Sequence, residues 1–423
     1  MMITLLFNPA SIITINTSGK NYKRGIELSD IGQLFEHSVL IEDDIIKDVI
    51  PGSSLNKNKY EKVIDVTGKT VFPGLVECHT HTAFAGSRAD EFRQRLSGIG
   101  YEEIAKKGGG INTTVTAVRS ASFEELVNII KPRIDHFISQ GITTLEIKSG
   151  YGLDFENERK LLQVINFLNE IYPIDIVPTF LGAHTFPPEF KSNHQIYVDE
   201  IINKMIPHFA NQKLAEFCDG FCEATAFSFD EIDKIFSIAK EHGLKLKLHT
   251  EQFNTIGGLD VALKHKAVSV DHLEAIKDED IPKLGKTDTV AVLLPGVSFF
   301  LNHKYAPARK LIEQNAIIAL ATDFNPGSSH ISSLSLIMSI AALKMKMTIE
   351  EAISAVTINA AKALCREQTI GSIEIGKKAN FAVFDTEDYA DIVYSIGNNL
   401  NCMTIKDGKV IYKDEEFFKG KLI

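Results

Sequence analysis

Short apolar runs alternate with longer segments of helical spacing from about residue 71 onward. Each run is rich in Val, Ile and Leu and ends in a polar or glycine-containing turn, which predicts buried strands followed by amphipathic helices. The predicted strands are residues 71–78, 142–147, 174–180, 217–224, 244–248, 267–270, 289–294 and 316–321. The predicted helices between them include residues 123–140, 155–172, 195–210 and 229–242.

This alternation implies βαβ units and a parallel sheet. Eight strand and helix pairs over about 250 residues have the size of a (β/α)8 TIM barrel, which is the α/β fold that we predict. A doubly wound sheet is the alternative, because periodicity alone does not show whether a sheet closes on itself.

The two ends of the chain have a different pattern. Residues 1–70 carry short β-like runs broken by Gly, Asn and Asp, and residues 366–423 do likewise. Each end by itself offers little apolar surface for a stable core. We therefore predict one small, β-sandwich-like domain built from both termini, which flanks a barrel of residues 71–365.

Composition narrows the class of protein. The chain has 423 residues, with 45 Lys and Arg against 55 Asp and Glu, and this acidic balance argues against nucleic acid as a partner. No segment approaches the roughly 18 uninterrupted apolar residues of a membrane span, and the apolar start lacks the basic residues of a signal peptide. The five scattered cysteines do not suggest a disulfide framework. We expect a cytoplasmic protein with no membrane partner.

Histidine changes this ordinary picture, because the chain has 13 His and no Trp. Several of them directly follow predicted strands, together with one aspartate: His79, His81, His184, His249, His272 and Asp323. Catalytic residues of TIM barrels come from the carboxyl ends of several strands. We therefore expect these side chains to meet in one mouth of the barrel.

A metal site is the sharpest interpretation of this set. His79 and His81 alternate on a strand, so both side chains point to the same side. With His249 and Asp323 they would offer three imidazoles and a carboxylate, a donor set that suits a catalytic Zn²⁺ or Fe²⁺. An isolated His-x-His pair is more often structural, but here two further strand ends supply ligands in the same mouth.

Longer motifs carry a family resemblance. Residues 72–81, with His249, His272 and Asp323, resemble the metal signature of the amidohydrolase superfamily. Further segments resemble, within it, the imidazolonepropionase family of histidine-degradation hydrolases: residues 82–88, 91–92, 108–111, 146–152, 180–184, 249–252 and 323–329. The resemblance implies a metal-dependent enzyme that hydrolyses the cyclic amide of 4-imidazolone-5-propanoate to N-formimidoyl-L-glutamate.

The resemblance also implies one divalent ion, held by His79, His81, His249 and Asp323. Two-metal relatives usually carry a carboxylated lysine at the end of strand four, where this chain has Glu223 instead. Lys148 at strand two leaves a second ion open, and the donor set does not choose between Zn²⁺ and Fe²⁺.

Three residues are candidates for proton transfer. Asp323 and His272 could accept a proton from the attacking water, and Glu251 could deliver one to the departing ring nitrogen. His272 could instead polarise the carbonyl. The sequence does not separate these roles.

The resemblance assigns a second group of residues to the substrate. Arg88 would bind the propionate carboxylate through a bidentate contact. Tyr151, His184 and Gln252 would contact the ring, and the glutamate end would be held by Asn325, Gly327 and Ser328. The alternatives are another cyclic-amide hydrolase, a heterocycle deaminase of the same superfamily, or a metal-free binding protein. A homodimer is the base-rate expectation for the assembly.

Overall fold

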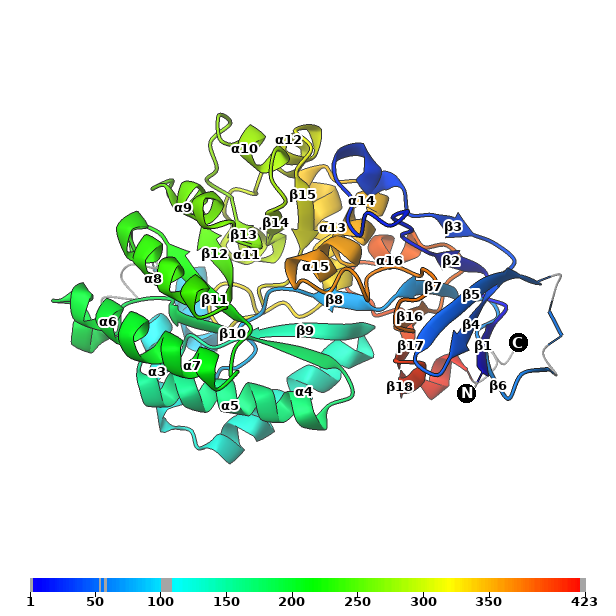
Figure 1. Cartoon of the computed structure of the whole chain (residues 1–423), viewed down its shortest axis with the longest axis horizontal. Coiled ribbons are helices and arrows are strands. Elements are labelled where there is room, and N and C mark those ends of the chain that lie inside the picture. Colours follow the sequence, from blue (N-terminus) through cyan, green and yellow to red (C-terminus); the bar gives the residue numbers. More distant parts are fainter. Residues whose placement is uncertain (1–2, 53–54, 57–58, 100–108, 419–423) are drawn as a thin grey trace.

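The computed structural model describes residues 3–52, 55–56, 59–99 and 109–418, so the predicted motif at 108–111 lies partly outside the described residues. Eight parallel strands form one curled sheet in chain order (Figure 1). They are β8 (Leu75–Glu77), β9 (Ile142–Lys148), β10 (Asp175–Ala183), β11 (Phe217–Cys222), β12 (Lys245–Thr250), β13 (Ser269–His272), β14 (Val290–Leu293) and β15 (Ile317–Leu320).

The first and last of these strands meet just beyond their carboxyl ends. Thr80 and Phe324 form a parallel bridge. The Asp323 N–H donates to the His79 carbonyl at 3.1 Å, and the His81 N–H donates to the Phe324 carbonyl at 3.0 Å. These bonds close the sheet into a ring. The predicted (β/α)8 barrel is therefore confirmed, and the doubly wound alternative is wrong.

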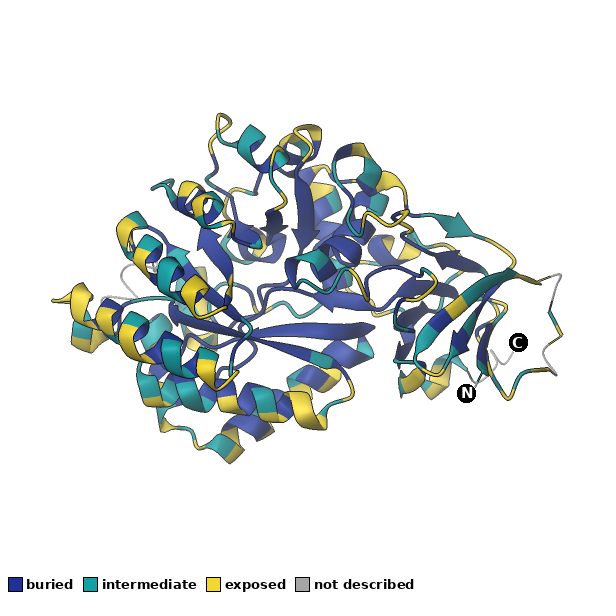
Figure 2. Ribbon diagram, viewed as in Figure 1, coloured by how far each residue is buried: buried dark blue, intermediate teal, exposed yellow. Residues whose placement is uncertain are grey.

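Helices cover the outside of the barrel, and their exposed residues face outward while the strands are buried (Figure 2). Three predicted helices each end one residue earlier than expected: α4 (Phe123–Ser139), α5 (Phe155–Ile171) and α8 (Phe229–Glu241). Capping boxes begin α4 at Ser122 and α8 at Ser228. None of the helices in the described part of the chain combines the length and apolar character needed to cross a membrane.

The predicted helix at 195–210 is divided by a π-turn. Its parts are α6 (His194–Glu200), the π-turn η5 (Ile201–Met205) and α7 (Ile206–Asn211). Pro207 has no N–H to give to the preceding turn, and the hydrogen-bond ladder shifts where that donor is missing. The remaining α-helices are α1 (Ala89–Leu96), α3 (Ile111–Ser120), α9 (Gly258–His265), α10 (Ile281–Gly285), α11 (Pro295–Leu301), α12 (Ala308–Glu313), α13 (Leu334–Met345), α14 (Ile349–Ala355), α15 (Ile358–Ala363) and α16 (Asp391–Tyr394).

Both ends of the chain build two further sheets beside the barrel (Figure 1). One has the order β5 (Ile45–Pro51), β4 (His37–Glu42), β1 (Ile3–Phe7), β6 (Lys62–Asp65). The other has the order β18 (Lys409–Lys413), β17 (Asn401–Lys406), β16 (Phe381–Phe384), β7 (Thr70–Pro73), β2 (Ser11–Ile13), β3 (Gln33–Leu34). One apolar core joins them, in which Val39 and Ile41 from one end are clustered with Phe381 and Ile405 from the other.

The predicted strand at 71–78 is two strands that serve different sheets. Residues 70–73 form β7, which pairs with β16, and residues 75–77 form β8, which pairs with β9. Gly74 stands between them, where an added Cβ would lie 2.3 Å from Thr143 Oγ1. Pro73-Gly74 is a turn signal inside the apolar run, and the chain changes sheets there, where close packing leaves no room for a side chain.

Candidate metal centre and active site

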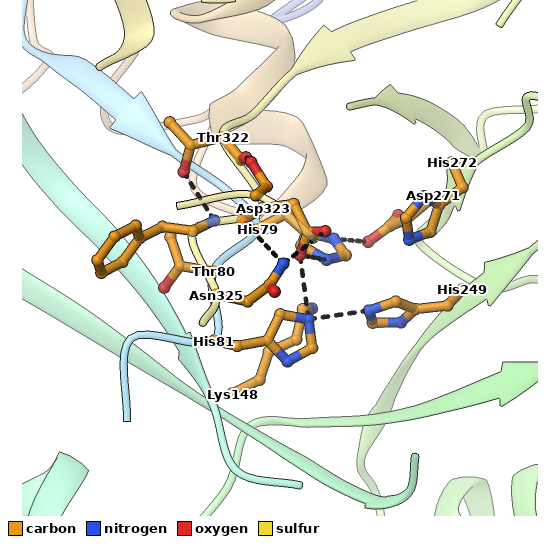
Figure 3. Close-up of polar contacts among 12 residues, drawn as sticks. His79, Thr80, His81, Lys148, His249, Asp271, His272, Thr322, Asp323 and Asn325 are labelled. Carbon is orange, nitrogen blue, oxygen red and sulfur yellow. Dashed lines mark hydrogen bonds and ion pairs between the residues drawn. The ribbon is translucent and has the colours of Figure 1, made fainter. Parts of the chain in front are cut away.

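Four side chains converge at the carboxyl end of the barrel (Figure 3). Asp323 Oδ1 lies 3.3 Å from His79 Nε2 and 3.2 Å from His81 Nε2. His249 Nε2 lies 3.2 Å from His81 Nε2, and all four side chains are buried. The bonds that close the barrel at residues 80 and 324 set the two ligand-bearing segments side by side.

This convergence fits a divalent ion. His79 Nε2 and Asp323 Oδ1 are buried and make no hydrogen bond. Burial lowers the pKa of His249 to about 3, which keeps that imidazole neutral and its lone pair free. Burial also opposes a charge on His79, but Asp271 and Asp323 outweigh it and raise the His79 pKa to about 9. The centre is therefore built to attract a positive charge, which an ion can supply.

Two carboxylates set the orientation of the histidine rings from behind. Asp271 Oδ2 accepts from His79 Nδ1 at 2.6 Å, and Asp219 Oδ1 accepts from His249 Nδ1 at 3.1 Å. Because Nδ1 carries the proton in such a contact, Nε2 is left as the metal-binding nitrogen. Sequence reasoning assigned no role to these aspartates. The sequence feature that could have revealed them is a charged residue inside an otherwise apolar strand.

The aspartates belong to a buried charged network beneath the centre. Lys148 Nζ lies 2.8 Å from Asp219 Oδ2 and 2.9 Å from Glu146 Oε2. Lys247 Nζ lies 3.0 Å from Glu146 Oε1 and donates to the Cys78 carbonyl at 2.7 Å. Acidic neighbours raise the pKa of Lys148 against the opposing effect of burial, so its amine is a cation.

Lys148, which left a second ion open, and Glu223, which replaces the carboxylated lysine of two-metal relatives, both have partners in the protein. Lys148 is the paired cation of the network, and both Glu223 oxygens accept backbone N–H groups, from Ala224 and from Phe253. Among the described residues, one group of His, Cys, Asp or Glu side chains is close enough to hold an ion, namely His79, His81 and His249. The described residues therefore offer one candidate group for an ion.

Two further candidates for proton transfer, besides the ligand Asp323, are buried histidine and glutamate side chains at the carboxyl ends of β13 and β12. The His272 ring centroid is 5.5 Å from that of His249, and its Nδ1 is buried without a hydrogen bond. Glu251 has a φ of +56°, so the strand alternation that orients His249 stops before it. Burial, assisted by Asp280, raises the pKa of Glu251 to about 7, and its Oε2 makes no hydrogen bond.

Rings predicted to contact the substrate surround His81. The His184 ring stacks on it at 5.1 Å between centroids, and the Tyr151 ring lies 5.9 Å from it. His184 Nδ1 donates to the Gly150 carbonyl at 2.9 Å. Gln252 is half-buried and follows Glu251. The structure thus brings Tyr151 and His184 beside the metal ligands.

The predicted anion-binding residues also come together. Arg88 Nε donates to Glu91 at 2.8 Å, and its Nη1 lies so close to Gly327 that an added Cβ there would be 2.0 Å away. The Asn325 side chain donates to Asp323 Oδ2 at 3.1 Å and accepts the N–H groups of Gly327 and Ser328. Asn325 therefore fixes the loop and the ligand Asp323 together.

The closed barrel and its histidine and aspartate cluster define a metal-dependent hydrolase. A family model described as the amidohydrolase family matches residues 70–411. The chain is 42% identical to an imidazolonepropionase of Flavobacterium johnsoniae over 97% of this chain and 100% of that protein. It is 44% identical to one of Geobacillus thermodenitrificans over 92% of this chain and 93% of that protein. The chain belongs to the amidohydrolase family and, within it, to the imidazolonepropionases.

Solved structures of lower identity share the fold. An adenosine deaminase from Xanthomonas campestris with bound zinc has a TM-score of 0.71 and 15% identity, over 96% of this chain and 92% of that one. A triazine hydrolase variant has a TM-score of 0.70 and 14% identity, over 98% of this chain and 96% of that one. The family and the histidine cluster together make this chain an enzyme that uses a divalent metal ion.

Replacing Asp271 by asparagine should weaken metal binding without removing a ligand. The amide loses the charge that holds the His79 Nδ1 proton, so we expect the metal affinity to fall by about 10- to 100-fold. Competition with a chromophoric chelator measures this affinity directly. Asp278→Asn is the control, because that carboxylate pairs with Lys310 on the surface. Equal affinities in the two variants would remove Asp271 from the metal site.

Proposed function

We propose that this chain hydrolyses 4-imidazolone-5-propanoate to N-formimidoyl-L-glutamate. The observation that carries the proposal is the 42% identity, over nearly the whole of both chains, to proteins named imidazolonepropionase. The buried cluster of three histidines and Asp323 supports a hydrolytic metal reaction, and Arg88 beside Gly327 supports an anionic substrate.

The reaction adds one water across the ring amide. The water oxygen bonds to the carbonyl carbon, the bond from that carbon to the ring nitrogen breaks, and the nitrogen receives a proton. We assign the ligand role to His79, His81, His249 and Asp323. When bound there, a divalent ion supplies a water of lowered pKa and polarises the amide carbonyl.

We assign both proton-transfer steps to side chains of the protein. Asp323 and His272 are our candidates to accept the proton of the attacking water, because His272 lies beside the ligand histidines and its Nδ1, 3.5 Å from Glu274 Oε2, makes no hydrogen bond. Glu251 is our candidate to protonate the departing nitrogen. Its pKa of about 7 lets the carboxyl both hold and release a proton near neutral pH.

The substrate is oriented by groups around the ligands. Tyr151 and His184 frame the ring position, with Gln252 alongside, and Arg88 receives the propionate carboxylate. Gly327 and Ser328 offer the glutamate end a position next to Arg88. Asn325 is better described as the residue that holds this loop, since its amide already bonds Asp323, Gly327 and Ser328.

Replacing Arg88 by methionine should raise KM and leave the metal content unchanged. Without the guanidinium the substrate carboxylate has no charge-assisted partner at this position, so KM is expected to rise by about 10- to 100-fold. The control is Arg93→Met in α1, the helix that begins directly after Arg88, since Arg93 is 79% exposed and pairs with the exposed Asp90. An unchanged KM in Arg88→Met would mean that another group binds the carboxylate.

The activity is tested by following substrate and product together. Loss of the absorbance of 4-imidazolone-5-propanoate with formation of N-formimidoyl-glutamate is the expected result. Ammonia release from a heterocyclic amine, with no ring opening of this substrate, would favour the alternative of a deaminase within the same family. The metal-free protein should be inactive in either assay, and activity without metal would contradict both hypotheses.

Metal identity and cellular context are finer points of the same proposal. The nitrogen and oxygen donors accept both Zn²⁺ and Fe²⁺, and kcat/KM after loading the metal-free protein with each ion decides between them. We propose a cytoplasmic location, supported by five cysteines that are all free. A homodimer is proposed from base rates alone and is tested by light scattering.

A further inference from the structure

A buried carboxylate organises the loop that leads from β9 into α5. Glu158, near the start of α5, is fully buried and turns its side chain back into this loop. Its Oε1 accepts the N–H groups of Gly150, Gly152 and Leu153 at 3.1, 2.7 and 2.9 Å. Its Oε2 accepts the Gly150 N–H at 3.0 Å. Three backbone donors therefore converge on one carboxylate, as they do in anion-binding nests.

The loop needs this support because its backbone is unusual. Gly150 has a φ of +104° and Leu153 a φ of +52°, and the second is a left-handed conformation that costs energy for a residue with a side chain. On the outer side, Arg119 donates to the carbonyls of Gly152 and Leu153 at 2.7 and 3.1 Å. Glu158 binds the donors of the loop and Arg119 binds its acceptors.

The same loop places two groups at the mouth of the barrel. It carries Tyr151, whose ring centroid lies 5.4 Å from that of His184. The Gly150 carbonyl accepts the proton of His184 Nδ1 at 2.9 Å, which fixes the tautomer and leaves Nε2 as an acceptor. Any shift of the loop would therefore move Tyr151 and release His184 together.

A further arm of the network reaches the strand that bears His184. The Ser149 side chain hydrogen-bonds Glu158, and its Oγ accepts the Leu181 N–H at 3.0 Å. Leu181 lies in β10, three residues before His184. The carboxylate thus couples the ends of β9 and β10 at the point where both present side chains to the substrate position.

We propose that Glu158 is a positioning residue for substrate binding, which holds Tyr151 and His184 in place through the loop of residues 149–153. This inference rests on the proposed function, since it takes these two rings as the substrate contacts. The Glu158 oxygens are bound by the loop and not by the metal ligands, so the effect of Glu158 should be separable from metal binding.

The direct test is Glu158→Gln in the full, metal-loaded chain. An amide offers one acceptor and turns donors toward the loop N–H groups, so the loop should shift while the shape of the side chain is kept. We expect KM for 4-imidazolone-5-propanoate to rise about tenfold, because binding groups that are no longer held in place lose affinity, with kcat changed by less than about threefold. Metal content should stay at the wild-type value.

The matched control is Glu351→Gln. Glu351 is also a buried carboxylate near the start of a helix, but its partners are Thr348 and Arg309. The Glu351→Gln variant should lose thermal stability, as Glu158→Gln does, but keep the KM of the wild-type protein. Active wild-type protein with an unchanged KM in Glu158→Gln would overturn the positioning role while leaving the proposed function intact.

A fluorescence measurement that does not depend on activity distinguishes a failure of the positioning role from a failure of the proposed function. The chain has no Trp, so Tyr151→Trp gives a single tryptophan on the loop, which is excited selectively over the tyrosines. Adding Glu158→Gln to this variant should lower the fluorescence anisotropy, because the loop loses its anchor. If the wild-type chain does not hydrolyse the substrate, the proposed function fails. If the anisotropy is unchanged, the positioning role of Glu158 fails, whatever the substrate.

A second variant covers the case in which Glu158→Gln does not fold. A Cβ on Gly152 would lie 2.4 Å from the Glu158 backbone nitrogen and 2.5 Å from the Asn157 carbonyl carbon, so Gly152→Ala must push the loop away from α5. The expected result is again a raised KM with normal metal content. A wild-type KM in Gly152→Ala would contradict the inference.

Discussion

Replacing His249 by alanine is expected to abolish metal retention and to lower kcat/KM by about a thousandfold or more. The imidazole is one of three whose ligand atoms lie within 4.8 Å of one another, and its Nε2 faces the position of the ion. The variant keeps His79, His81 and Asp323, but an incomplete donor set should release the ion during gel filtration. Metal analysis of the eluted protein and steady-state kinetics measure the two effects.

The matched control for this experiment is His242→Ala. His242 is exposed at the end of α8 and undergoes the same chemical change away from the barrel mouth. It should retain one ion per chain and wild-type kinetics. If His249→Ala retained one ion per chain and normal activity, His249 would not be a metal ligand.

Replacing Lys148 by methionine should have the largest effect on stability. Its ammonium lies 2.8 Å from Asp219 and 2.9 Å from Glu146, and all three side chains are fully buried. Removing the cation leaves buried carboxylates without their main counter-charge, which costs about 3–5 kcal/mol in comparable pairs. Glu146 keeps Lys247 as a partner, so the loss should be concentrated at Asp219 and at the His249 ring that it orients.

Lys283→Met provides the comparison. Lys283 also lies between two aspartates, 2.6 Å from Asp260 and 2.8 Å from Asp280, but its side chain is 41% exposed. Water screens such pairs, so the expected change in unfolding free energy is within about 1 kcal/mol. Chemical denaturation of both metal-loaded variants measures the difference. A loss in Lys148→Met no larger than that in Lys283→Met would show that the buried acids do not depend on the lysine.

Local sequence patterns were sufficient to predict the direction of a side chain where that direction is set by the residue's own strand. His79 and His81 alternate along one extended segment, so their shared direction follows from backbone geometry alone. The same reasoning does not hold at Glu251, because the strand ends at Thr250 and a φ of +56° turns the next residue. A positive φ in a residue other than glycine leaves little trace in a sequence.

Packing across the barrel determined the features that local patterns did not show. Asp271 and Asp219 approach His79 and His249 from other strands, at separations of 192 and 30 residues. The sequence predicts that Asn325 contacts the glutamate end of the product, and the fold adds that its amide bonds Asp323 and the loop after it. Such partners depend on where strands lie in space.

The sequence by itself determined the alternation of strands and helices, the polar residues at the strand ends and the family. These features are encoded in side-chain periodicity and in contiguous motifs, which need no knowledge of distant contacts. The tertiary structure alone decided that β8 and β15 meet, that the run at 71–78 divides at Gly74 between two sheets, and that buried carboxylates orient the histidines. Each of these depends on contacts between segments far apart in the chain, where close packing and the satisfaction of buried charges choose the partner.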